Sequence, residues 1–292
     1  MKKNIPKTLI AVIMLLSFSL THAQKEAYLL YNAKGKKVRY ERMLNKCKRA
    51  DVVLFGELHN DPIAHWMQYE LTKDLHHQIG NKLILGAEMF EADGQLILDE
   101  YFAGLITTKK FEEEMRLWEN YQTDYKPLLE FAKENKLEFI ATNIPRRYAN
   151  MVYKLGLDSL DALTDEAKRF MMPLPLEYDT TLNAYSALAG GSPAMGGHGN
   201  ANLRDAQVVK DATMAWFILK HLDKGETFLH FNGAYHSDHY ESISYFLKKM
   251  APGINIVTIS TVNQEYISFL ETSHVGKADY ILAVPASMTR TY

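Results

Sequence analysis

Four short runs of apolar residues, each followed by polar residues, set the pattern of this chain. The runs cover residues 51–55, 82–85, 137–141 and 227–231. Each has the length of a buried strand, and the helical pattern over 62–79 between the first two predicts a parallel sheet. Because the carboxyl ends of parallel strands share one edge, outside which ligands bind, we expect the polar residues after these runs to meet at one site.

Long stretches between these strands carry helical patterns. Residues 94–135 look helical throughout, and residues 146–222 contain no convincing strand. The second stretch predicts helices over 148–155, 164–171 and 203–222, with a long loop over 173–202. These patterns predict an α/β fold with a mainly parallel sheet flanked by helices and a smaller helical subdomain inserted. The expected boundaries are 24–93, 136–146 and 223–292 for the sheet domain, and 94–135 and 147–222 for the helical insertions.

Shorter patterns mark the two ends of the domain. They predict a hairpin from 27–32 and 37–40, a helix over 240–250, a strand over 254–260, and closing strands near 265–270 and 279–284.

The first 23 residues have the composition of a secretory signal peptide. Three lysines precede an apolar stretch over residues 9–20, and Thr21-His22-Ala23 resembles a cleavage site. We therefore expect an exported protein, most simply periplasmic, beginning at Gln24. Cys47 is the only cysteine, so no intramolecular disulfide is expected. It also lies too far past the signal to be the lipidated residue of a lipoprotein.

The charge balance argues against some classes of partner. Loss of the three signal lysines from 33 basic residues, against 35 acidic ones, brings the net charge near −5. We recognise no basic stripe, so nucleic acid is not an expected partner. No segment after the signal approaches the roughly 20 continuous apolar residues of a membrane span, so none is expected in the mature chain.

Two Gly-x-x-His sequences and one further glutamate are the main candidates for chemistry. Glu57 and His59 follow a strand two residues apart, so an extended backbone would point both side chains the same way. Such a pair suits metal ligation or a general base with its acid partner; the alternative is a helix cap with a buried histidine. Glu88 stands where a buried strand ends, and His236 repeats the Gly-x-x-His spacing. A buried glutamate needs a cation, a metal or solvent.

The helix over 203–222 and the turn after the third strand supply further candidates. Arg204, Gln207 and Asp211 share one helix face, which is either functional or a solvated stripe. Arginine in the first turn is unfavourable with the helix dipole, which favours an anion-pairing role for Arg204. Asn143 follows a strand, and at least one of Arg146 and Arg147 is expected to bind a carboxylate.

These residues resemble the ChaN family of haem-binding, iron-regulated bacterial proteins, which is grouped with the Tiki and TraB proteins and the erythromycin esterases. The resemblance covers roughly residues 45–285. Its markers are Gly56-Glu57-Leu58-His59 with Asn60-Asp61-Pro62 and His65, Glu88-Met89-Phe90, Asn143-Ile144-Pro145-Arg146, Ala206-Gln207 with Asp211 and Met214-Ala215, and Gly233 with His236. The resemblance implies a sheet domain with a smaller helical domain and haem bound at the interface of a homodimer. Many ChaN-like proteins are lipoproteins, and this chain lacks the lipidated cysteine.

Haem requires an axial ligand, apolar walls and cations for its propionates. Tyr178, Tyr185 and His198, in or beside the long loop, are the predicted axial ligands. The chain has no Cys-x-x-Cys-His motif, so any haem would be held non-covalently. The first hypothesis is therefore an exported haem-binding protein that serves haem or iron acquisition.

The wider superfamily implies a second hypothesis, a metal-dependent hydrolase. In this interpretation Glu57, His59, Glu88 and His236 hold a divalent metal ion that activates water. Arg204 is a further catalytic candidate, and the supporting residues are Asn143, Arg147, Gln207 and Asp211. A third possibility is that the site is an inherited relic whose buried charges pair with Arg204 or Arg147.

Overall fold

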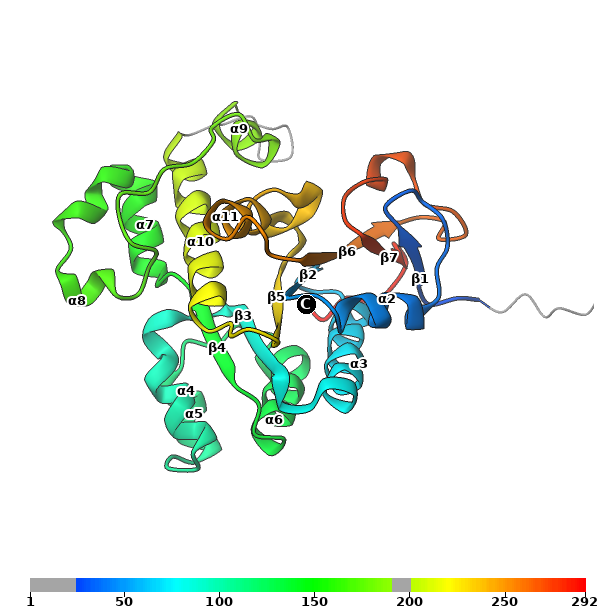
Figure 1. The fold of residues 1–292 in the computed structure, drawn as a ribbon, viewed down its shortest axis with the longest axis horizontal. Helices are drawn as coiled ribbons and strands as arrows, with labels where there is room; N and C mark the ends of the chain where they lie inside the picture. Colours follow the sequence, from blue (N-terminus) through cyan, green and yellow to red (C-terminus); the bar gives the residue numbers. More distant parts are fainter. Residues whose placement is uncertain (1–24, 191–200) are drawn as a thin grey trace, which may run out of the picture.

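A computed structural model describes residues 25–190 and 201–292 (Figure 1). The predicted signal peptide, residues 1–23, and the haem-ligand candidate His198 lie outside the described residues. Within the described part, no helix is both long enough and apolar enough to cross a bilayer.

One seven-stranded sheet forms the centre of the molecule, with strand order β1-β7-β6-β2-β5-β3-β4. Every neighbouring pair is parallel except β1 and β7, which run antiparallel at one edge. The predicted α/β class with a mainly parallel sheet is therefore confirmed. The strands are β1 (Leu29–Asn32), β2 (Val52–Glu57), β3 (Leu83–Glu91), β4 (Phe139–Asn143), β5 (Thr227–Gly233), β6 (Ile256–Gln264) and β7 (Tyr280–Pro285).

Helices cover both faces of this sheet. Along β2, Val53 and Phe55 point into one core while Val52 and Leu54 point into the other, as the two-residue period of a strand requires. The first core is covered by α2 (Tyr40–Cys47), α3 (Pro62–Ile79), α4 (Gln95–Phe102), α5 (Thr108–Glu114) and α6 (Lys126–Glu134). The second is covered by α7 (Arg146–Leu155), α9 (Asn183–Gly190), α10 (Ala201–Lys220) and α11 (Ile243–Met250), with the short α8 (Asp165–Lys168) nearby. Burial on both faces explains why the central strands are apolar without alternation.

The two helical stretches therefore join separate cores on opposite faces of the sheet. Helices α4 to α6 pack with α3, whereas α7 and α10 pack against each other and against the far face. They do not share the single core that one common helical subdomain would require. The stretch 94–135 is also not helical throughout, because extended and turn residues separate α5 from a π-helical turn, Tyr121–Tyr125.

Two predicted strands at the β1 edge are absent among the described residues. The expected hairpin is reduced to a single bridge between Tyr31 and Lys37, because the chain turns into α2 at Tyr40. The expected strand at 265–270 is a turn. The Gln264 side chain folds it back by donating hydrogen bonds to the carbonyl oxygens of Tyr266 and Phe269, at 2.6 and 2.5 Å.

Candidate functional site

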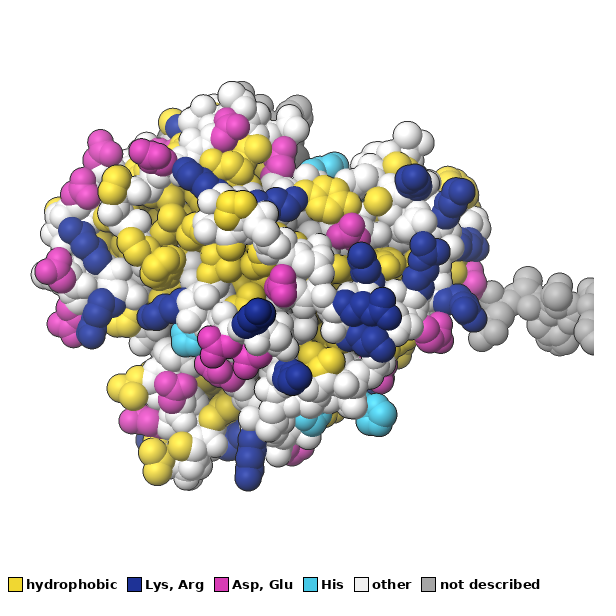
Figure 2. Space-filling model, viewed as in Figure 1, with side chains coloured by type: hydrophobic (Ala, Val, Ile, Leu, Met, Phe, Trp, Pro, Cys, Tyr) yellow, Lys and Arg dark blue, Asp and Glu magenta, His cyan; other side chains and the backbone are white. Residues whose placement is uncertain are grey.

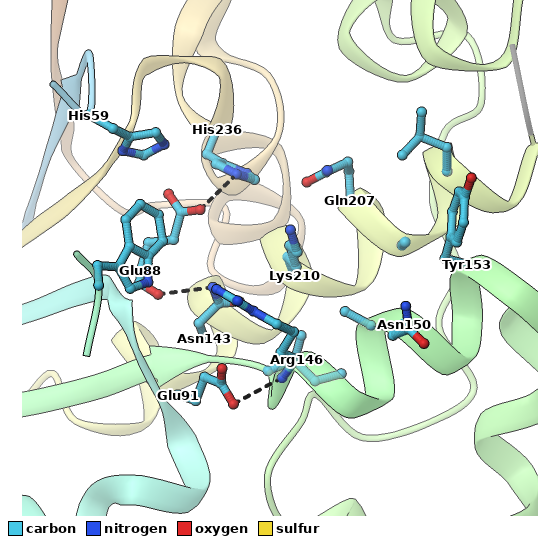
Figure 3. Close-up of a pocket in the computed structure, with 15 residues that line it drawn as sticks. His59, Glu88, Glu91, Asn143, Arg146, Asn150, Tyr153, Gln207, Lys210 and His236 are labelled. Carbon is cyan, nitrogen blue, oxygen red and sulfur yellow. Dashed lines mark hydrogen bonds and ion pairs between the residues drawn. The ribbon is translucent and has the colours of Figure 1, made fainter. Parts of the chain in front are cut away.

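Polar side chains from four neighbouring strands converge at the carboxyl edge of the sheet. Glu57 ends β2, Asn143 ends β4, Glu88 lies near the end of β3, and His236 follows β5 in a short 3-10 turn. These strands are adjacent in the order β2-β5-β3-β4. The structure thus brings His59 and His236, from opposite ends of the chain, to the wall of one pocket together with Glu88 (Figure 3).

Glu57 anchors the half of the site that lies beneath α3. Its side chain is only 1% exposed, and its Oε1 atom lies 3.0 Å from His59 Nδ1 and 2.6 Å from the Tyr125 hydroxyl that donates to it. Gln68 donates to Oε2 at 2.6 Å. Burial alone would raise the pKa of Glu57, but the nearby His65 and the hydrogen bond with His59 outweigh it and lower the pKa. Glu57 is therefore a carboxylate that orients the His59 ring.

His236 lies between two buried carboxylates in the other half of the site. Its Nε2 atom is 3.2 Å from Glu88 Oε1, and its Nδ1 atom is 2.5 Å from Asp211 Oδ1. The Tyr185 hydroxyl donates to the second Asp211 oxygen at 2.8 Å. Burial opposes the charged imidazolium, but Glu88 and Asp211 outweigh it and raise the pKa of His236 to about 10. The two acids therefore favour the protonated form of His236.

A close contact with His59 explains why a glycine, Gly233, stands three residues before His236. A Cβ atom at this position would lie 2.8 Å from both Cε1 and Nε2 of His59. The Gly233 amide donates to Glu88 Oε2 at 2.8 Å. Since the backbone itself contacts both side chains, only glycine leaves room for His59 beside Glu88.

A pocket of about 500 Å³ extends from these groups into the space between α7 and α10. His59, Glu88 and His236 lie at its inner end and Tyr153 lies at its outer end (Figure 3), and Leu203 also lines it. The remaining walls are formed by Glu91, Trp118, Asn143, Ile144, Arg146, Ala149, Asn150, Ala206, Gln207 and Lys210. The side-chain oxygen of Asn143 is buried and has no hydrogen-bond partner among the described residues. The pocket therefore combines apolar walls with donors, acceptors and cations.

Three of the predicted supporting residues take distinct places around this pocket. Gln207 lines it, and Asp211 is fully buried against His236, so the solvated-stripe interpretation is wrong for Asp211. Arg147 pairs with Asp93, which confirms that one of the two arginines after Pro145 binds a carboxylate. Arg204 does not line the pocket. Its Nε atom pairs with Asp205 at 3.0 Å.

The two predicted haem ligands within the described residues, Tyr178 and Tyr185, both donate their hydroxyl groups to carboxylates of the protein. Tyr178 donates to Asp205 at 2.5 Å, and the fully buried Tyr185 donates to Asp211. Sequence reasoning missed Tyr153 and Lys210, which line the pocket. A helical spacing could have found them, because Arg146, Asn150 and Tyr153 share one face of α7, as Leu203, Gln207 and Lys210 share one face of α10.

The geometry around the predicted metal ligands is that of ion pairs and hydrogen bonds. Both ring nitrogens of His236 contact carboxylates, and Nδ1 of His59 contacts Glu57. Across residues 25–190 and 201–292, no group of three or more His, Cys, Asp and Glu side chains is placed to hold a metal ion. The metal-ligand set of Glu57, His59, Glu88 and His236 stays a prediction.

Comparison with known proteins identifies the class to which this fold and site belong. The family described as haem-binding uptake, Tiki superfamily, ChaN matches residues 43–247, well over half of the chain. The chain is therefore a Tiki-superfamily α/β protein. It belongs to the ChaN family within that superfamily, as its sequence motifs predicted. No curated protein matches it significantly.

Solved structures support the same fold. The structure titled as cofacial heme binding to ChaN of Campylobacter jejuni is 19% identical, with a TM-score of 0.68, and covers 89% of this chain and 97% of its own. A mutant of the erythromycin esterase EreC in its open conformation is 10% identical, with a TM-score of 0.51, covering 89% and 98%. A Bacillus cereus protein is 12% identical, with a TM-score of 0.50, covering 84% and 90%. At these identities the likeness concerns the fold.

Proposed function

We propose that this protein binds haem non-covalently in the pocket between α7 and α10, and that it serves haem or iron acquisition after export. Two findings support the proposal: the chain belongs to a haem-binding uptake family, and the pocket's lining suits an amphipathic carboxylate ligand. The single observation that carries it is the pocket itself, whose volume of about 500 Å³ falls within the roughly 300–1,000 Å³ of small-ligand sites.

The middle of the pocket suits the haem propionates. Arg146 and Lys210 line it, and neither side chain forms an ion pair with any described residue. Unpaired cations beside an open cavity favour a carboxylate ligand, because a charge-assisted hydrogen bond is about twice as strong as a neutral one. Ile144, Ala149 and Ala206 supply apolar wall next to them. This combination matches a planar apolar ring with two acidic substituents.

Tyr153 is the residue in this wall that we propose as the axial ligand. It is 44% exposed, and its hydroxyl makes no hydrogen bond within the described residues. Phenolate oxygen is an established haem ligand in proteins. When bound, the haem iron supplies the coordination position that this oxygen would fill. His59 is the competing candidate, since it lines the pocket and Glu57 contacts its Nδ1 atom, which leaves Nε2 as the ring nitrogen for a ligand.

A saturable haem titration of the purified protein tests the proposal. We expect a shift of the Soret band that saturates at a defined stoichiometry, because a formed pocket offers a limited number of sites. Uptake that rises without saturation, or that matches an unrelated protein of similar composition, would contradict haem binding. Export is tested separately by cell fractionation and by mass spectrometry of the N-terminus, which should begin at Gln24.

A further inference from the structure

The segment of residues 34–49 is strongly basic on a chain with a formal net charge of −2. It contains eight lysines and arginines and a single acid, Glu41. The basic residues are Lys34, Lys36, Lys37, Arg39, Arg42, Lys46, Lys48 and Arg49. The expectation that the chain lacks a basic stripe is therefore wrong.

These cations are exposed and form no ion pairs among the described residues. Seven of the eight are exposed and Lys48 is half-buried, and none forms an ion pair within the described part of the chain. Elsewhere, by contrast, Lys110 and Lys126 pair with glutamates at 2.7 Å. A concentration of unpaired cations produces a local positive potential on a chain that is acidic overall.

The fold gathers these residues on one surface. The apolar face of α2 places Met43, Leu44 and Cys47 in the core and leaves Arg42 and Lys46 outside. Lys34, Arg42 and Lys46 line one depression of about 210 Å³, in which Asp279 is the one acid. Figure 2 shows the lysine and arginine side chains gathered over the end of the molecule that carries α2 and β1.

Exposed apolar side chains lie beside the basic segment. The loop after β6 packs on the turn at Gly35, where a Cβ atom would lie 3.5 Å from Val275 Cγ2. The same loop exposes 63% of Tyr266 and 57% of Phe269. Glu265 and Glu271 flank them, so the loop contributes apolar area rather than positive charge. Cations next to exposed aromatic rings are typical of surfaces that sit at a membrane–water interface.

We propose that this basic–aromatic surface, formed by the cations of residues 34–49 with Tyr266, Phe269 and Val275, binds the anionic surface of a phospholipid bilayer. Each lysine or arginine is attracted to anionic headgroups, and the apolar loop enters the headgroup region. Nucleic acid would pair with the cations and stack on the rings, but it offers no matching contact to Val275. The surface lies at the opposite end of the molecule from α7 and α10 (Figure 1). Docking would therefore leave the pocket between them open.

Vesicle sedimentation tests this surface. The full chain should bind phosphatidylcholine vesicles containing phosphatidylglycerol at low salt, and bind pure phosphatidylcholine far more weakly. The combined variant Lys34→Gln, Lys36→Gln, Lys37→Gln should weaken binding by about 100-fold, at about fivefold per cation. The matched variant Lys109→Gln, Lys110→Gln, Lys224→Gln removes the same charge elsewhere and should change binding little. The N-terminal segment is the same in the wild type and in both triple variants, so it does not affect the comparison between them.

Three outcomes would overturn the proposal. They are equal binding to both lipid compositions, equal loss in both triple variants, and tighter binding of a single-stranded oligonucleotide than of the anionic vesicles at physiological salt. A second variant, Phe269→Ser, removes apolar area without changing charge and should weaken the binding that persists at high salt. Because the substituted side chains are exposed, each variant should fold, and circular dichroism checks that it does.

Discussion

The His59 ring lies against the backbone of Gly233, whose amide donates to Glu88, so residue 233 leaves no room for a side chain. This contact explains how two Gly-x-x-His sequences separated by most of the chain form one structure. The first glycine, Gly56, is equally constrained, because a Cβ atom there would lie 2.8 Å from the Ala234 backbone.

Gly233→Ala should destabilise the protein and displace His59. The added methyl group would lie 2.8 Å from the ring, and overpacking of this kind costs about 1–3 kcal/mol. Urea unfolding measures the loss. Gly253→Ala is the control, because a Cβ atom at Gly253 meets nothing within 4 Å. If the two variants are equally stable, the close approach of His59 to Gly233 is incorrect.

His230 should make the stability depend on pH below neutrality. It is fully buried between Thr142 and Asn232, and burial lowers its pKa from 6.5 to about 4. Between these values the unfolded chain binds a proton that the folded chain does not. Stability should therefore fall as pH falls from 6.5 to 4, by roughly 3 kcal/mol. His236 has a raised pKa and therefore acts in the opposite direction. Its contribution to stability is lost as the pH rises from 6.5 to about 10.

Unfolding of the His230→Gln variant between pH 4 and 6.5 measures the contribution of His230. The variant should show a flatter dependence than the wild type, whereas His77→Gln, at an exposed position of α3, should keep the wild-type slope. Identical slopes in His230→Gln and the wild type would show that His230 is not the buried neutral group described.

At the scale of elements, the faces of α7 and α10 form the two outer walls of the pocket. Each helix contributes pocket residues spaced three or four positions apart, and an adjoining face packs into the core, with Ala149 and Ala206 in both sets. Strand ends supply the inner wall. Ligand binding should therefore respond to substitutions on these helix faces more than to substitutions elsewhere on the same helices.

Lys210→Gln should weaken haem binding by about 10- to 100-fold, the value of a hydrogen bond to a charged group. The wild type should also prefer haem to its dimethyl ester, whose propionates carry no charge, and the variant should lose that preference. Lys154→Gln removes a charge from α7 at a position outside the pocket lining and should behave as the wild type. Equal binding of haem and its ester by the wild type would contradict the role of Lys210 while leaving haem binding intact.

Sequence patterns predicted the elements that carry strong local signals. The strands ending at Glu57, Asn143 and Gly233 were predicted because each apolar run stops at a polar group. The turn at 265–270 was not predicted, because a side-chain hydrogen bond from Gln264 ends β6 and apolar alternation does not reveal such a bond. Helical spacing can place Tyr153 and Lys210 on helix faces, but the pairing of α7 with α10 depends on contacts between distant residues, so local patterns do not reveal that the two face one cavity.

At the scale of the whole molecule, we propose that haem binding is coupled to formation of a homodimer. Tyr153 at the outer end of the pocket and its neighbour Leu155 are both exposed, Leu155 by 71%. Haem seated at this outer end would leave part of its apolar surface uncovered, which a second copy could cover.

Sedimentation velocity should show a larger dimer fraction with haem than without it. Leu155→Glu should reduce that fraction, because it places a charge in the proposed interface. Leu105→Glu, at a position that is 76% exposed and outside the pocket lining, is the control. A haem-loaded wild type that remains monomeric would rule out the coupling and would leave the haem site itself untouched.

The most direct test of the central claim is the absorption and resonance Raman spectrum of the ferric haem complex of Tyr153→Phe. The substitution removes one hydroxyl from the pocket wall, and Tyr178→Phe removes one that is engaged by Asp205. We predict that the wild type and Tyr178→Phe show iron–phenolate bands and that Tyr153→Phe loses them and binds haem more weakly. An unchanged spectrum in Tyr153→Phe, with loss of haem in His59→Ala, would contradict this placement of the iron.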